Sequence, residues 1–397
     1  MTTADMAGTF AITNVRAVLS DRVLDNATVL VDDGLITTIS ESGSRLPGAF
    51  DGQGLLLLPG LVDSHSDGLE KEISPRRTTT FELGFALQSF ESRLRSAGIT
   101  TAFHGVGYQN KPQYGRSIDG AREVARAIRQ RRSDTAAVDH RVLYRLEARE
   151  PDALDPLLDD LENRAHGEGV PMLSFEDHTP GQGQFRDPEQ YAASIDPTTL
   201  EPGETPQSRV AKLMADAAEL LEVREKNLAR LEPLATSGRI RMLAHDAESP
   251  SDISTSSGSG ASIAEFPLTL DAAQAARDAG MRIVMGAPNA LRGRSHSGNA
   301  SARDLVAAGL CDVLASDYMP TTMLAAALKM AAEGVCSLPA AVGLITSGPA
   351  EMAGLDDRGR IETGRRGDLI LVDGRGAWPQ VVGVHRPEDR RLAPLSA

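Results

Sequence analysis

Along the middle of the chain, short apolar runs alternate with stretches whose apolar residues recur at helical spacing. Eight runs have the length and composition of buried strands, and they cover residues 55–65, 99–105, 141–148, 170–178, 239–248, 262–266, 282–289 and 311–318. Buried strands separated by amphipathic helices are typical of parallel sheets. Eight such units predict an α/β protein with a (β/α)8 barrel. A doubly wound open sheet is the alternative, less favoured because no GxGxxG follows a strand.

The two ends of the chain follow another pattern. Residues 9–57 alternate short β-type runs with turn signals such as Asp32-Asp33-Gly34, and a similar run returns at 359–374. This pattern predicts a small antiparallel sheet to which both termini contribute. We therefore expect a small β-sandwich domain of residues 1–58 and 355–397 beside a barrel of residues 59–354.

A long segment, residues 180–238, separates two of the predicted strands. It begins with a polar loop and continues with a charged stretch, 209–234, whose apolar residues have helical spacing. We expect a helical insertion here, for which a lid and an ordinary outer helix are equally compatible with the pattern. The serine-rich segment 250–260 is predicted to be a flexible loop.

Composition and charge exclude several classes of protein. The net charge of −14 over 397 residues disfavours binding to nucleic acid or to acidic membranes. Two cysteines form no disulfide framework, and no apolar run approaches the roughly 20 residues that span a bilayer. The first residues do not resemble a signal peptide. We expect a cytoplasmic protein, with a homodimer as the commonest oligomer.

The predicted strands end in residues that can bind metal ions. At or just after their last positions stand His65, Asp67, His104, Glu147, His178, His245 and Asp317. Catalytic groups of a (β/α)8 barrel lie at the carboxyl ends of its strands, so we expect these side chains to lie close together. Imidazole and carboxylate ligands together suit divalent zinc, manganese or iron.

We expect two ions. His65 and Asp67, two apart at a strand end, would hold one ion, and His178 with His245 the other; Glu147 would bridge them. Asp317 would bind metal and take the proton from an attacking water, which the ions acidify. In this interpretation residues 55–65 form one barrel strand. The alternative to a metal site at the end of this strand is an ordinary loop in which Asp67 caps a helix.

The same residues resemble the amidohydrolase superfamily, which has a His-x-Asp or His-x-His start, two later histidines and a final aspartate. Longer stretches, LPGLVDSHSDGLEKEISPR, SFEDHTPGQGQF, GAPNALRGRSHSGN and CDVLASDYMPTTMLAAAL, resemble its α-D-ribose 1-methylphosphonate 5-triphosphate diphosphatase family. The matches extend from residue 55 to about residue 330. The resemblance implies a phosphorylated sugar phosphonate as substrate, whose 5-triphosphate is hydrolysed to diphosphate and a 5-phosphate.

Residues 286–299 have the composition of an anion site. Arginines and small polar residues there can donate to phosphate oxygens, and we expect substrate contacts from Arg292, Arg294, Ser295, His296 and Asn299. A loop with a solvated arginine pair is the alternative. We also place His104 at the pocket wall.

Four positions depart from the family pattern. They are Gly68, Arg77, His104 and Ala247, where the family usually has asparagine, proline, aspartate and aspartate. The departures leave the expected metal ligands in place and alter the pocket wall. A related enzyme that cleaves a C–N bond of another small polar molecule is therefore the second hypothesis. A barrel that has lost its metals and serves as a binding scaffold is the third, and the intact ligand set disfavours it.

Overall fold

The computed structural model describes residues 9–41, 48–76, 78–112, 115–134, 136–164, 168–294 and 299–388. The chain divides into two compact units. The first unit contains residues 1–104, 129–141 and 313–397, and the second contains residues 105–128 and 142–312. Two of the boundaries, at 104/105 and 141/142, fall within strands, and the one at 128/129 falls within a helix. None of them lies at residue 58 or 354, so the expected division into a β domain and a barrel there stays a prediction.

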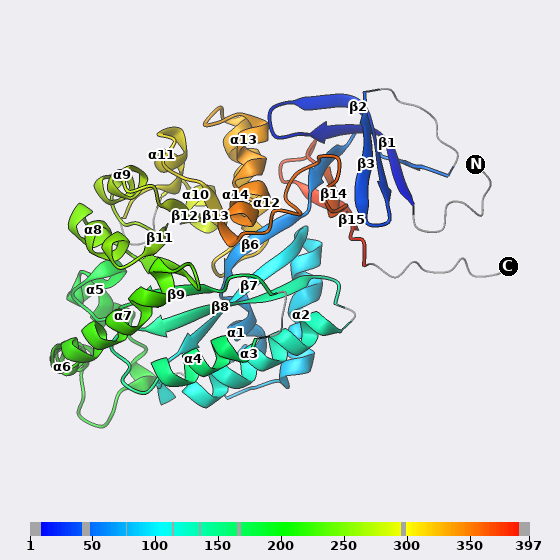
Figure 1. Cartoon of the computed structure of the whole chain (residues 1–397). Helices are drawn as coiled ribbons and strands as arrows, with labels where there is room; N and C mark the ends of the chain where they lie inside the picture. Colours follow the sequence, from blue (N-terminus) through cyan, green and yellow to red (C-terminus); the bar gives the residue numbers. More distant parts are fainter. Residues whose placement is uncertain are drawn as a thin grey trace. The chain divides into compact units, whose positions relative to one another are not determined.

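Eight strands follow one another in a single sheet (Figure 1). They are β6 (Leu61–Ser66), β7 (Ile99–Tyr108), β8 (Asp139–Glu147), β9 (Met172–Glu176), β10 (Arg241–His245), β11 (Ala261–Glu265), β12 (Arg282–Gly286) and β13 (Val313–Ala315). Neighbours in the sheet are neighbours in the chain, and the described pairings are parallel. This is the strand order of a (β/α)8 barrel, so the predicted fold class is confirmed.

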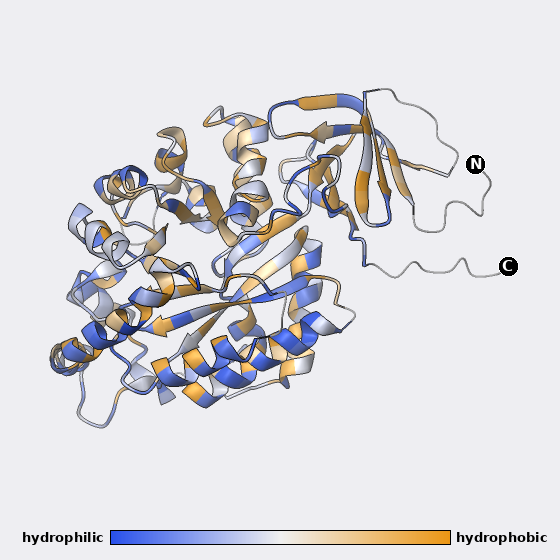
Figure 2. Ribbon diagram, in the orientation of Figure 1, coloured by the Kyte–Doolittle hydropathy of each residue, from blue (hydrophilic) through white to orange (hydrophobic). Residues whose placement is uncertain are grey.

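Helices follow the strands as the pattern predicts. The helices outside the insertion are α1 (Gly68–Ile73), α2 (Leu83–Ser96), α3 (Ile118–Ser133), α4 (Leu154–Glu162), α8 (Pro250–Gly258), α9 (Leu270–Asp278), α10 (Ala287–Arg292), α11 (Ala302–Ala307), α12 (Thr322–Ala332), α13 (Leu338–Gly343) and α14 (Ser347–Ala353). Hydrophobic positions recur between hydrophilic ones along α3 and α4 (Figure 2). In α4 the buried side chains include Leu154, Leu157 and Leu161, which share one helix face.

The small sheet contains strands from both ends of the chain, as expected. Its seven strands are β1 (Phe10–Val18), β2 (Val23–Asp32), β3 (Leu35–Ser40), β4 (Phe50–Asp51), β5 (Leu56–Pro59), β14 (Leu369–Asp373) and β15 (Gln380–His385). All belong to the first unit, where β14 and β15 lie beside the amino-terminal strands (Figure 1). The sheet is mixed rather than antiparallel, because β1 pairs in parallel with β4 and β5.

The prediction of one barrel strand over residues 55–65 is wrong. Leu56–Pro59 forms β5, which pairs with β14 and β1 of the small sheet, and only Leu61–Ser66 forms the first barrel strand. The break falls at Pro59-Gly60. A Cβ on Gly60 would lie 2.3 Å from Oγ1 of Thr100, so the chain passes from one sheet to the other where only glycine fits.

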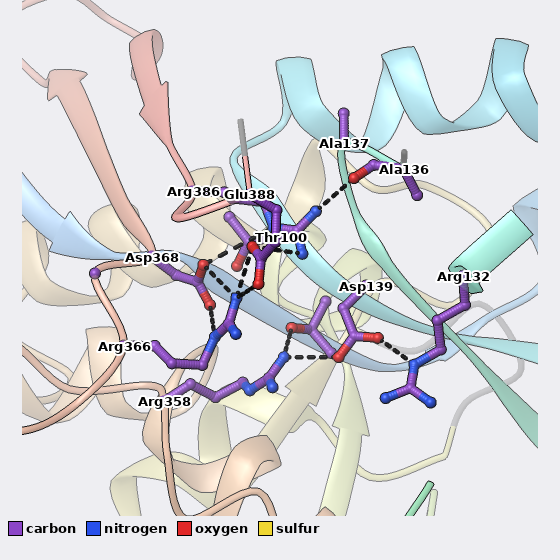
Figure 3. Close-up of polar contacts among 12 residues, drawn as sticks. Thr100, Arg132, Ala136, Ala137, Asp139, Arg358, Arg366, Asp368, Arg386 and Glu388 are labelled. Carbon is purple, nitrogen blue, oxygen red and sulfur yellow. Dashed lines mark hydrogen bonds and ion pairs between the residues drawn. The ribbon is translucent and has the colours of Figure 1, made fainter. Parts of the chain in front are cut away.

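A buried polar network lies at the amino-terminal ends of β7 and β8 in the first unit (Figure 3). The guanidinium of Arg358 donates to Oγ1 of Thr101 and to Oδ2 of Asp139, both at 2.8 Å, and Arg132 donates to Oδ1 of Asp139 at 2.6 Å. Burial opposes ionisation of Asp139, but the surrounding arginines outweigh it and hold the pKa of this carboxyl far below its usual range. Groups at this end of a barrel stabilise the fold rather than contact substrate.

The insertion is helical, as expected. It contains α5 (Pro188–Ser194), α6 (Pro206–Glu219) and α7 (Leu221–Thr236), with short 3-10 turns at Gly183–Phe185 and Pro197–Thr199. By contrast, the loop predicted at 250–260 is mostly the helix α8. Ser249 accepts a hydrogen bond from the backbone N–H of Asp252, whose side chain caps Ser249 in return. Within the described ranges, every helix is too short or too polar to cross a lipid bilayer.

Candidate metal centre

Three of the predicted ligands lie together in the first unit. The N–H of Asp317 donates to the carbonyl of His65 at 2.9 Å, and the N–H of Asp67 donates to the carbonyl of Asp317 at 2.7 Å. These bonds join the end of β6 to the residues after β13. As a result His65, Asp67 and Asp317 each place a possible ligand atom within 4.8 Å of the other two. We call these three residues the His65 group.

Asp67 does not act as a helix cap. It precedes the first residue of α1, but its side chain makes no hydrogen bond to the amides of that helix. Its Oδ1 lies 3.4 Å from Nε2 of His65 instead. The next residue is one of the family departures, and a Cβ on Gly68 would lie 2.5 Å from the ring of Phe90. Packing against this ring therefore explains glycine at position 68.

A second group lies at the strand ends of the second unit. His178, His245 and Asp246 each place a possible ligand atom within 4.8 Å of the others, and the two imidazole centres are 5.4 Å apart. We call these residues the His245 group. Asp246 was not predicted. It has a φ of 54°, in the left-handed region that non-glycine residues rarely adopt and that is enriched at functional sites.

The imidazole of His245 is oriented from behind by a carboxylate. Its Nδ1 lies 2.8 Å from Oε2 of Glu265, which also accepts a 2.6 Å hydrogen bond from Ser174. Its Nε2 faces Asp246, with Oδ2 at 3.5 Å. Metal-binding histidines typically show this arrangement, in which one ring nitrogen is held by a carboxylate and the other is presented to the ion.

Electrostatics around His245 favour a cation. Burial alone would lower the pKa of this imidazole, but the carboxylates of Asp246, Glu176 and Glu265 raise it to about 9. The same concentration of negative charge that favours a proton on the ring attracts a divalent ion. Together with the mixed imidazole and carboxylate donors, it shows that the His245 group suits such an ion.

Glu147 holds the second histidine of this group. Its Oε2 lies 3.0 Å from Nδ1 of His178 and 3.3 Å from Nζ of Lys111, and its Oε1 accepts a 3.0 Å bond from the N–H of His178. Burial opposes ionisation of Glu147, but the bonds from His178 and the charge of Lys111 lower its pKa to about 2. Glu147 thus orients His178 as Glu265 orients His245. Its expected role as a bridge between two ions stays a prediction.

His104 belongs to a buried chain of hydrogen bonds in the first unit. Its Nε2 lies 2.8 Å from Nδ1 of His140, whose Nε2 lies 2.8 Å from Oε2 of Glu91. Arg131 donates to both oxygens of Glu91 at 2.6 and 3.2 Å. Burial and the neighbouring His140 lower the pKa of His104 well below its usual value, and its ring is fully buried. The expected contact between His104 and substrate stays a prediction.

The predicted anion site follows β12. Arg292 ends helix α10, and Gly293 closes it with a φ of 73°; both Arg292 and Arg294 are exposed. Asn299 is half-buried. Ser295 and His296 lie outside the described residues, as does the departure Arg77. The substrate contacts expected here stay predictions.

Sequence comparisons assign the family. The model of the amidohydrolase family matches residues 268–391. The chain is also 35% identical over 364 residues to the α-D-ribose 1-methylphosphonate 5-triphosphate diphosphatase of Escherichia coli K12, covering 91% of this chain and 94% of that enzyme. The chain belongs to the amidohydrolase superfamily. Within it, this amidohydrolase is in the family of that diphosphatase, as the sequence motifs indicated.

Solved structures agree with this assignment at the level of the fold. An enamidase of the amidohydrolase superfamily is 16% identical, with a TM-score of 0.57, 96% of this chain and 95% of that chain covered. N-acetylglucosamine-6-phosphate deacetylase from Pasteurella multocida is 12% identical, with a TM-score of 0.57 and coverage of 96% and 98%. Amidohydrolases typically use divalent metal ions, and the two groups described above suit them.

Proposed function

We propose that this amidohydrolase hydrolyses the 5-triphosphate of a ribosyl phosphonate. Water would be added across the anhydride bond between the α and β phosphates, which yields a 5-phosphate and diphosphate. The observation that carries the proposal is the 35% identity, over nearly the whole of both chains, to an enzyme named for that reaction. The histidine and carboxylate groups at the strand ends support it, because they suit metal-assisted hydrolysis.

The described residues have distinct roles in this proposal. The His65 group and the His245 group would hold divalent ions, which would supply Lewis-acid activation of water and of phosphorus. Asp317, fixed by backbone bonds to His65 and Asp67, would accept the proton of the attacking water. Glu265 and Glu147 would keep the imidazoles of His245 and His178 in the orientation that binds metal.

We extend the proposal to the ions and the assembly. The donors suit zinc, manganese or iron, and two separate groups of them support two ions per chain. A homodimer in the cytoplasm is the expected state of the enzyme. Metal analysis of the purified protein and light scattering of its main species would test these points.

The experiment compares two products. The metal-supplemented enzyme is incubated with a ribosyl phosphonate 5-triphosphate, and diphosphate and the 5-phosphate are measured. Cleavage of C–N bonds is measured in parallel, as ammonia released from primary amides and amines and as the ring-opened acid formed from cyclic amides. We expect diphosphate from the first assay and no C–N cleavage in the second. C–N cleavage without release of diphosphate would refute the proposal in favour of C–N bond hydrolysis.

A variant tests the proposed base. Asp317→Asn should retain its ions and lose turnover by several orders of magnitude, because it removes the proton acceptor and keeps the backbone bonds to β6. Asp356→Asn, an exposed aspartate elsewhere in the first unit, serves as the control and should be fully active. Turnover of Asp317→Asn at the rate of the wild type would exclude this role.

A further inference from the structure

A cavity of about 200 Å³ lies in the second unit, beside the His245 group. Residues from strand ends and from the insertion line it together: they include Lys111, Glu147, Arg149, His178, Tyr191 and Arg209. Tyr191 belongs to α5 and Arg209 to α6. The insertion therefore forms a wall of the same cavity that contains Glu147 and a candidate metal ligand, rather than only an outer layer.

Lys111 presents unused donors to this cavity. It is one of five lysines in the chain and follows β7, where paired backbone bonds with Arg116 hold it. Its ammonium lies 3.3 Å from Oε2 of Glu147, and its side chain is 32% exposed. Among the described residues, Glu147 is the one acceptor of this ammonium. Since an ammonium has three N–H donors, two remain for a ligand.

The two arginines of the cavity wall are already neutralised. Arg149 donates to Asp177 at 2.9 Å and also to the carbonyl of Ala217, which ties α6 to the end of β8. Arg209 pairs with Glu204. Both arginines are thus held in the walls. Lys111 also pairs with a carboxylate, Glu147, but through one longer contact of 3.3 Å, so two of its N–H donors can bind an incoming anion.

We propose that this cavity binds the diphosphate part of the substrate, with Lys111 as a substrate-binding residue and α5 and α6 as its cover. The inference rests on the proposed function. The volume fits it, because a cavity of about 200 Å³ is smaller than the roughly 300–1,000 Å³ of pockets for drug-sized ligands. It suits a pair of phosphate groups rather than the whole substrate, and Lys111 donates two charge-assisted bonds to their oxygens.

The test uses inorganic diphosphate as the probe and the metal-loaded enzyme. Calorimetric titration should show that Lys111→Met binds diphosphate about 10- to 100-fold more weakly than wild type, the size expected for lost charge-assisted hydrogen bonds. Its KM for the triphosphate substrate should rise more than its kcat falls, with metal content unchanged. Lys226→Met is the matched control, because Lys226 is exposed on α7 and does not line the cavity.

Other outcomes would overturn the inference. Diphosphate affinity of Lys111→Met equal to that of wild type would do so, as would an equal loss of affinity in Lys226→Met. Loss of metal with unchanged affinity in the reloaded variant would show that Lys111 only positions Glu147. Lys111→Gln, which keeps a polar side chain, replaces the methionine variant if that does not fold. If the wild-type enzyme releases no diphosphate from the triphosphate, the proposed function fails. If it does, and the Lys111 variants bind diphosphate as tightly as wild type, only the present inference fails.

Discussion

The buried carboxylate of Glu91 offers the clearest test of the energetics. It lies within helix α2, is 5% exposed, and accepts hydrogen bonds from both Arg131 and His140. Burial alone would raise its pKa, but the bonds from His140 and Arg131 lower it to about 2 from the usual 4.5. The folded protein therefore holds the ionised form more strongly than the unfolded chain does.

This difference has a calculable size. At about 1.36 kcal/mol for each pKa unit, a carboxyl that titrates at about 2 instead of 4.5 stabilises the fold by about 3 kcal/mol at neutral pH. Because the pKa is lowered by folding, this stabilisation is complete above pH 4.5. It is lost as the pH falls toward 2, where folded and unfolded states are both protonated.

The variant Glu91→Gln removes the charge and keeps the shape. We expect it to lose about 3 kcal/mol at pH 7. With roughly 2.1 cal/mol/K of unfolding entropy per residue, this corresponds to a Tm about 4 °C lower if all 397 residues unfold together, and about 7 °C lower if the first unit unfolds alone. Calorimetric scans of both proteins from pH 7 down to pH 3 should show that the difference between their Tm values becomes smaller.

An exposed pair in the same unit provides the control. Asp25 lies 3.0 Å from Arg16 with both side chains in solvent, so Asp25→Asn should change stability by less than about 1 kcal/mol. The reasoning is refuted if Glu91→Gln has the Tm of wild type at pH 7. It is equally refuted if this difference in Tm stays constant down to pH 3, because then the charge of Glu91 is not its source.

Three further substitutions test the site and its support. His178→Asn should lower the metal bound per chain, and elemental analysis that finds unchanged stoichiometry would argue against this residue as a ligand. Arg292→Ala should raise KM several-fold for a polyphosphate substrate and leave an uncharged one almost unaffected; equal effects would indicate a structural role. Gly68→Ala should destabilise the protein by about 1–3 kcal/mol, because the new Cβ would clash with Phe90, and the additional change Phe90→Leu should restore part of the loss in thermal melts.

Much of the fold was predictable because buried parallel strands are nearly continuous apolar runs. The split of residues 55–65 was not, since hydrophobicity shows that a strand is buried but not in which sheet. Pro59-Gly60 was the visible signal. Helix α8 was missed because serine and glycine dominate its composition. The Ser249 and Asp252 spacing of a capping box was present and outweighs that composition.

The candidate site was predictable where its residues end strands. The polar residues at the carboxyl ends of the predicted strands included the histidines of both groups and Asp317, because strand ends meet at one edge of a sheet. It did not find Lys111, which stands three residues after β7, or His140, which stands near the start of β8. Glu91 had a signal of its own, since it shares a buried helix face with Leu87, Phe90 and Leu94.

A triphosphate needs positive charge that most of this acidic chain does not provide. His104 does not supply it, because burial and His140 lower its pKa and leave the ring neutral. Near the candidate ligands of the second unit, Arg145 is neutralised by Glu176, just as Arg149 is by Asp177. We therefore expect the positive charge to come from bound divalent ions, from Lys111 and from the exposed arginines after β12. An enzyme that loses these cations would keep its fold and its histidine groups, and would lose its selectivity for polyphosphates over neutral substrates.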